Sequence, residues 1–161
     1  MDVARILLPV KGGLVDDQTL KLASRLVRQD HGSIIALYVI EVLREYPLDV
    51  ELPEETRRGE QVLRHVEDTL HRHKCKVSAA ELVQARDAGA AVVREAIERS
   101  ADMILVGLPY KRRHGAFSMG QAVPYILENA PCQVLVLREP GPAEPPAKAD
   151  QESRSVSGAV R

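Results

Sequence analysis

Five short runs of aliphatic residues recur in the first 138 residues, and amphipathic stretches separate them. The runs cover residues 6–10, 34–42, 76–84, 104–106 and 134–137. The run at 104–106 has lost the period-2 alternation of a half-exposed strand, which is typical of a strand buried on both faces. The alternation of strands and helices predicts an α/β fold. We expect an open, doubly wound, five-stranded parallel sheet with helices on both faces.

Four amphipathic helices are predicted between these strands. Asp16 or Asp17 is expected to cap the first helix, and Pro53 begins the second. Gly89 introduces the third helix, and the fourth begins just after Gly120. In the last two helices, helical spacing predicts a core-facing side made of Val92, Val93, Ala96, Ile97, Val123, Ile126, Leu127 and Ala130.

Composition narrows the classes of protein that fit. The chain is 45% hydrophobic but only 3% aromatic, which favours an aliphatic core. Its formal net charge of −1 gives no general attraction to nucleic acid or to an anionic membrane. No apolar run is long enough to cross a bilayer, and the first residues lack the pattern of a signal peptide. We therefore expect a cytoplasmic protein, not inserted in a membrane, with no nucleic-acid partner.

The composition changes after residue 138. Residues 139–161 hold four of the ten prolines and almost no large apolar side chain. Such a segment cannot bury enough apolar surface to fold. The sequence therefore predicts one domain at residues 1–138 and a disordered tail, rich in proline, alanine and serine, at 139–161.

A candidate anion site lies between the last two strands. Gly107 ends one strand, a basic loop follows, and Gly120 precedes a helix whose first N–H groups are free to bind an anion. The polar residues of this loop are Lys111, Arg112, Arg113, His114 and Ser118. If the first and fourth strands are neighbours, Val10, Lys11 and Gly12 line the same crevice. A phosphate-bearing ligand and an empty loop with solvated charges both fit this pattern.

No catalytic or metal site is predicted. The spacing of His65, His71, His73 and Cys75 does not match a zinc site, whose ligands on one helix lie three or four residues apart. Ser118 does not match the nucleophile-elbow pattern. No general base supports hydrolysis of ATP, so slow ATP hydrolysis ranks as the least favoured function.

Three segments resemble the universal stress protein (UspA) family. They read ILLPVKGG at residues 6–13, GAAVVREAIERSADMILVGLP at 89–109 and APCQVLVLR at 130–138, and the resemblance covers residues 3–138. It implies a Rossmann-like sheet of the adenine nucleotide alpha hydrolase-like type, with strand order 3-2-1-4-5. The family's nucleotide loop is G-2x-G-9x-G-[S/T]: three glycines separated by two and then nine residues of any type, with a serine or threonine directly after the third glycine.

The resemblance also shows where this chain departs from the ATP-binding pattern. Gly107 and Gly120 take the first and third glycine positions of the loop, whereas Tyr110 takes the second and Gln121 the Ser/Thr position. Lys11 stands where ATP-binding members have an aspartate. We expect Tyr110 to crowd the place where phosphates would lie. The nucleotide-like pocket implied by the resemblance comprises Val10, Lys11, Gly12, Val39, Gly107, Tyr110, Arg112, Arg113, Ser118, Gly120 and Gln121.

The resemblance implies a function as well. It predicts a regulatory or stress-response domain that is not an enzyme, requires no cofactor and has a degenerate site for ATP or another adenine nucleotide. The last strand, with Val134, Leu135, Val136 and Leu137, is expected at the sheet edge, where it would build a homodimer. The alternative is a sensor of a nucleotide or another phosphate ligand, with a protein partner or membrane transporter that it assists.

Overall fold

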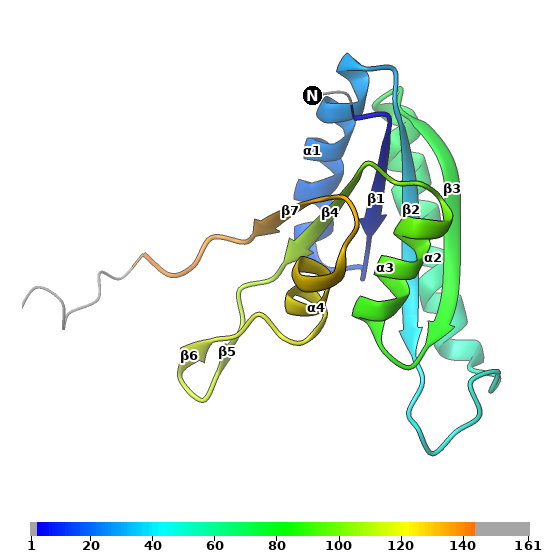
Figure 1. Ribbon diagram of the computed structural model, residues 1–161, viewed down its shortest axis with the longest axis vertical. Helices are drawn as coiled ribbons and strands as arrows, with labels where there is room; N and C mark the ends of the chain where they lie inside the picture. The colour runs from blue at the N-terminus through cyan, green and yellow to red at the C-terminus, as the bar shows by residue number, and fades with distance from the viewer. Residues whose placement is uncertain (1–2, 144–161) are drawn as a thin grey trace, which may run out of the picture.

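Five parallel strands form the centre of the computed structural model, which describes residues 3–143 (Figure 1). Their order is β3-β2-β1-β4-β7. The strands are β1 (Arg5–Pro9), β2 (Ser33–Glu41), β3 (Lys76–Ala85), β4 (Met103–Leu108) and β7 (Gln133–Arg138). All four strand pairings are parallel. With β7 counted as the fifth strand of the sheet, the predicted order 3-2-1-4-5 and the predicted fold class are confirmed.

Two helices cover each face of the sheet (Figure 1). The helices are α1 (Leu14–Gln29) and α2 (Pro53–Arg72) on one face, and α3 (Ala88–Glu98) and α4 (Ala122–Asn129) on the other. Successive side chains of a strand point to opposite faces. In β1, Ile6 and Leu8 therefore pack with the α1–α2 layer, and Leu7 packs with the α3–α4 layer. All three are fully buried, so the central strand reads as one apolar run.

The basic loop that follows β4 contains a small hairpin. Strands β5 (Arg112–Arg113) and β6 (Ala116–Phe117) pair antiparallel. The two residues between them, His114 and Gly115, have φ values of 55° and 77°. A two-residue turn with both φ values positive matches the right-handed twist of a hairpin. The sequence analysis predicted a loop here and did not identify the hairpin.

Two predictions about the helices are wrong in detail. α1 begins at Leu14 with Gly13 as its N-cap, so Asp16 and Asp17 lie within the first turn and do not cap the helix. Ile97 and Leu127 are 59% and 51% exposed, although both were expected in the core. Each of these helices turns a narrower apolar stripe toward the sheet than the spacing suggested. The buried residues of that stripe are Val92, Val93, Ala96, Val123 and Ile126.

The segment that follows β7 contacts the sheet and the region before the hairpin. The N–H of Glu139 donates to the carbonyl of Leu108 at 2.9 Å, and a Glu139 carboxylate oxygen accepts the N–H of Tyr110 at 3.1 Å. These contacts place Glu139, the first residue of the predicted tail, beside the end of β4. Residues 144–161 of that predicted tail lie outside the described residues.

Candidate functional site

The candidate site lies where strands β1 and β4 run side by side. Ile6 pairs with Met103 and Leu7 with Ile104, so the carboxyl ends of both strands reach the same edge of the sheet. From β1 the chain builds β2 and β3 to one side, and then crosses back to build β4 and β7 on the other side. Ligands of open α/β sheets bind at such a reversal of strand order. The predicted neighbourhood of the first and fourth strands is confirmed.

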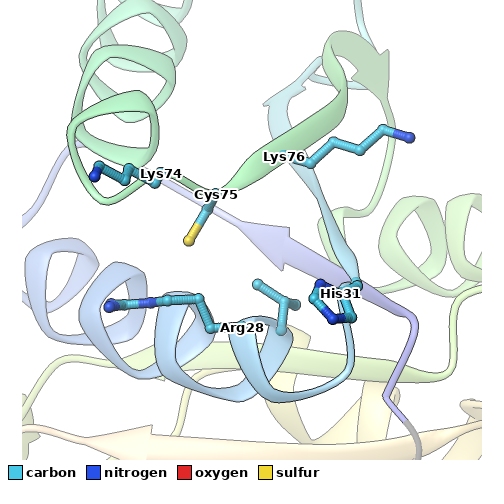
Figure 2. A pocket seen from close by; sticks show the side chains of 7 residues that line it. Arg28, His31, Lys74, Cys75 and Lys76 are labelled. Atoms are coloured by element: carbon cyan, nitrogen blue, oxygen red, sulfur yellow. The ribbon is translucent and has the colours of Figure 1, made fainter.

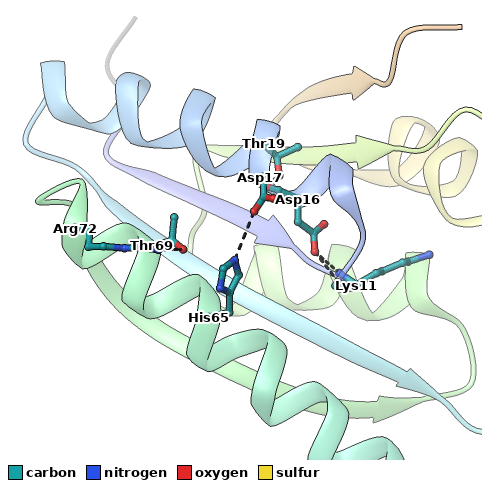
Figure 3. A network of polar contacts seen from close by, with 8 residues as sticks. Lys11, Asp16, Asp17, Thr19, His65, Thr69 and Arg72 are labelled. Atoms are coloured by element: carbon teal, nitrogen blue, oxygen red, sulfur yellow. Dashed lines mark hydrogen bonds and ion pairs between the residues drawn. The ribbon is translucent and has the colours of Figure 1, made fainter.

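The turn after β1 is held by a carboxylate from its own helix. Asp16 Oδ2 accepts the backbone N–H of Lys11 at 3.0 Å and that of Gly12 at 2.7 Å (Figure 3). Asp16 is only 7% exposed, and its burial raises the pKa of the carboxyl, while the two N–H groups act in the opposite direction. The Lys11 side chain extends away from Asp16 (Figure 3). Both N–H groups of the turn are therefore already satisfied.

Asp16 is the residue at this site that the sequence analysis assigned to another role. It was expected to cap α1, yet its side chain bonds to the turn that precedes the helix. The available signal was its position four residues after Gly12, which has φ +88° and forms the turn. A carboxylate in the first turn of a helix can reach back to such a turn.

Gly107 is required by the close approach of α1. A Cβ built at this position would lie 3.0 Å from both methyl groups of Val15 and 3.1 Å from the Thr19 methyl. These distances are shorter than ordinary van der Waals contact, so a larger residue would require Val15 and Thr19 to shift by a few tenths of an ångström. The sequence analysis expected a backbone or a ligand to approach Gly107. The structure shows that side chains of α1 do so.

The start of α4 is the more open part of the site. Gly120 has φ +69°, and a Cβ built there would meet no atom within 4 Å. Its N–H donates to Ser118 Oγ at 3.2 Å. Gln121 is the N-cap of α4 but makes no side-chain capping bond. Because the first N–H groups of a helix have no partner within it, this end can accept an anion.

Tyr110 packs into a cluster of aromatic and basic side chains on the hairpin side of the site. Its ring stacks on Phe117 with the two centroids 5.3 Å apart and the planes inclined by 18°. The Arg138 guanidinium carbon lies 5.2 Å from the Tyr110 centroid and 5.4 Å from that of Phe117. Arg112 Nε donates to the Tyr110 hydroxyl at 3.3 Å. Tyr110 thereby joins β7 to the hairpin.

The other predicted site residues are spread around this edge of the sheet. Val10 is buried and its N–H donates to the Leu37 carbonyl at 2.9 Å. Val39 lies further along β2, partly buried against the α3–α4 core. Arg113 is exposed on the hairpin. The pocket as a whole stays a prediction.

β7 forms one edge of the sheet, as expected for the last strand. Val134 and Val136 pack against the α3–α4 core, whereas Leu135 is 37% exposed. This strand therefore presents both an apolar side chain and an unpaired backbone edge.

Residues 3–143 contain no group of three histidine, cysteine, aspartate or glutamate side chains placed to hold a metal ion. In the same part of the chain, no helix has the length and apolar character needed to span a bilayer. Cys75 is buried, with 5% of its surface exposed.

Comparison with known proteins decides the family. The sequence model of the universal stress protein family matches residues 3–138. The chain belongs to the universal stress protein family. No curated protein matches it by sequence.

Solved structures of universal stress proteins share its fold. One from Burkholderia pseudomallei is 20% identical, with a TM-score of 0.64 over 84% of this chain and 96% of that one. One from Archaeoglobus fulgidus in complex with dAMP is 14% identical, with a TM-score of 0.66 over 84% and 98%. A family member from Arabidopsis thaliana with AMP bound is 16% identical, with a TM-score of 0.60 over 91% and 99%. At sequence identities of 20% or less, these similarities show a shared fold.

Proposed function

We propose that this universal stress protein is a regulatory domain without enzymatic activity, that it acts in the stress response as a homodimer, and that it does not hold ATP tightly. The observation that carries this proposal is the pair of bonds from Lys11 and Gly12 to Asp16. A phosphate at this turn would find the N–H groups of Lys11 and Gly12 already bonded, and the buried carboxylate would repel it.

The alternative function is a sensor of a nucleotide or another phosphate ligand. The free start of α4 and the exposed basic residues Arg112 and Arg113 favour it. Two solved structures of the same fold contain dAMP or AMP, which adds to its support. In this alternative the ligand would approach from the Gly120 side and leave the β1 turn closed. A protein partner, or a membrane transporter that the domain assists, fits either function.

The first experiment asks whether the purified protein carries a nucleotide. The protein is prepared without added nucleotide and denatured with acid, and the supernatant is separated by anion exchange with ultraviolet detection. We expect no adenine nucleotide, and no heat of binding when ATP is titrated into the protein. A near-stoichiometric nucleotide would overturn the proposal in favour of the sensor. Release of phosphate from ATP would overturn the absence of enzymatic activity.

A gain-of-function series tests which residues keep ATP out. The triple variant Lys11→Asp, Tyr110→Gly, Gln121→Ser restores the family pattern in the loop, at Tyr110 and Gln121, and in the turn after β1, at Lys11. Adding Asp16→Asn to it removes the internal charge but keeps an oxygen that can accept the two N–H groups. We expect the quadruple variant to bind ATP at least tenfold more tightly than the triple variant. Equal affinity of the two would show that Asp16 does not exclude the nucleotide.

A further inference from the structure

A basic hollow lies at the opposite end of the sheet from the candidate site, where β2 and β3 begin. Its lining residues are Val27, Arg28, His31, Gly32, Lys74, Cys75 and Lys76. Four of these seven side chains are basic and none is acidic. Figure 2 shows Arg28 and Lys74 extending on one side of the hollow, with His31 and Lys76 on the other. The Cys75 sulfur points into the space between them.

The fold builds this hollow from two helix ends of the same geometry. The N–H of Gly32 donates to the Val27 carbonyl at 2.8 Å at the end of α1. The N–H of Cys75 donates to the Leu70 carbonyl at 2.9 Å at the end of α2. In each case the bond closes a Schellman motif. The residue before each donor, His31 or Lys74, has positive φ, at 52° and 57°. Two equivalent turns thus place one basic residue each at the hollow, on opposite sides of it.

The helix ends do not need these basic groups as hydrogen-bond donors. Backbone N–H groups already bond the carbonyls of Val27, Leu70 and His71 near the two helix ends. Among the described residues 3–143, Arg28 is the one basic lining residue whose side chain bonds to a helix carbonyl, with Nε donating to the carbonyl of Ser24 at 3.2 Å. The side-chain ends of His31, Lys74 and Lys76 are therefore not needed to cap the helices and can bind another group.

The positive charge of the hollow is not neutralised by ion pairs. Within residues 3–143, none of the ion pairs involves Arg28, His31, Lys74 or Lys76. The neighbouring carboxylate, Asp30, accepts the N–H of Val3 at 3.1 Å. Lys74 and Lys76 extend outward on opposite sides of the hollow (Figure 2), and several basic side chains without ion pairs around one hollow raise the local positive potential and attract anions.

We propose that this hollow binds a small phosphate-bearing molecule. The four basic side chains would hold its charged oxygens, and the Cys75 thiol, 3.6 Å from the carbonyls of Ser24 and His73, would form part of the wall. The hollow has a volume of about 200 Å³. At the ~30 Å³ that one water occupies, this equals roughly seven waters, so a ligand larger than a single phosphate fits. The site lies apart from the crevice at Gly107 and Gly120, so its occupancy does not depend on the function proposed above.

Pyrophosphate is the probe for the test, and backbone amide chemical shifts of the full chain are the readout. We expect saturable shifts at Gly32 and at Lys74, Cys75 and Lys76, together with a saturable rise in the melting temperature. The double variant Lys74→Gln, Lys76→Gln should weaken the affinity at least tenfold. Arg25→Gln, an exposed arginine of α1 outside the lining, should leave it unchanged.

Three outcomes would overturn the proposal. One is a response that sodium chloride reproduces at equal ionic strength. Another is equal weakening by Arg25→Gln, which would indicate general attraction to the surface. The third is a set of shifts confined to Gly107 and Gly120, which would place pyrophosphate in the candidate nucleotide site. Inorganic phosphate, titrated in parallel, should bind more weakly because one phosphate group engages fewer of the four basic side chains.

Discussion

The backbone N–H of Gly12 donates to Asp16 Oδ2 at 2.7 Å, so a side chain of the protein itself occupies the donor group of the β1 turn. In an open α/β fold this turn faces the place where ligands bind. The bond links the geometry of the turn to the first turn of α1. It therefore joins the candidate site to a single buried carboxyl, that of Asp16.

The pH dependence of stability should reveal this carboxyl. Burial raises the pKa of Asp16 above 3.8, so the folded protein binds its proton more tightly than the unfolded chain does. The contribution of Asp16 to the free energy of unfolding is therefore largest at low pH. It falls as the pH rises from 3.8 through the raised pKa, and is constant above it.

Asp16→Asn removes this titration, and urea unfolding from about pH 3.5 to 7 measures the effect. The stability of the wild type relative to the variant should decrease across this range and then level off. Asp68→Asn, which changes an exposed carboxylate of α2 that is not among the charges acting on Asp16, is the matched control and should show no such trend. If the stability of the wild type relative to Asp16→Asn instead increased with pH, the effect of the two N–H bonds on the pKa of Asp16 would outweigh that of burial.

Gly107→Ala should lower the free energy of unfolding by about 1–3 kcal/mol, the usual range for an extra carbon in a packed interior. The added Cβ would press on Val15 and Thr19 from α1 at 3.0–3.1 Å. Chemical denaturation measures the loss. In the double variant Gly107→Ala, Val15→Ala the loss should be smaller than the sum of the two single losses, because the nearest methyl groups are gone. Strict additivity would contradict packing as the role of this glycine.

Tyr110→Ala should loosen the hairpin without unfolding the sheet. It removes an aromatic pair worth about 0.5–1.5 kcal/mol and the ring over which Arg138 lies. Amide hydrogen exchange should become several-fold faster at Arg113 and Ser118, with no change in β2. Tyr46→Ala, an exposed tyrosine in the segment after β2, is the matched control. Unchanged hydrogen exchange in the hairpin would mean that its backbone hydrogen bonds hold it together without the Tyr110 ring.

Much of the fold could be predicted from the sequence because the pattern of buried strands is long and repeated. Each aliphatic run became a strand, and the alternation with helices predicted that the strands are parallel, whereas their order came from the family resemblance. Helix faces were predicted less well. Ile97 and Leu127 follow the helical spacing, but α3 and α4 each rest on the sheet with a narrow stripe, so the next apolar residue is exposed.

The candidate site could be located from the sequence, but its internal bonds could not. The adjacency of β1 and β4 follows from the family order and is confirmed. In contrast, a short-range pattern cannot tell whether Asp16 bonds forward to its own helix or back to the β1 turn. Likewise, the stacking of Tyr110 on Phe117 depends on the two-residue turn at His114 and Gly115, whose positive φ values the residue pair only weakly signals.

The edge of the sheet at β7 gives the prediction that tests the homodimer. Leu135 is 37% exposed on a strand whose outer backbone groups have no partner strand in the sheet. Pairing with the same strand of a second copy would bury this leucine and satisfy the edge.

Leu135→Glu places two carboxylates near the two-fold axis of such a dimer, where desolvation and repulsion oppose pairing. Light scattering at micromolar concentration should therefore show a dimer for the wild type and a monomer for Leu135→Glu. Leu43→Glu changes an exposed leucine that follows β2, toward the other edge of the sheet, and should remain dimeric. A monomeric wild type, or a dimer that persists in Leu135→Glu, would remove β7 as the interface.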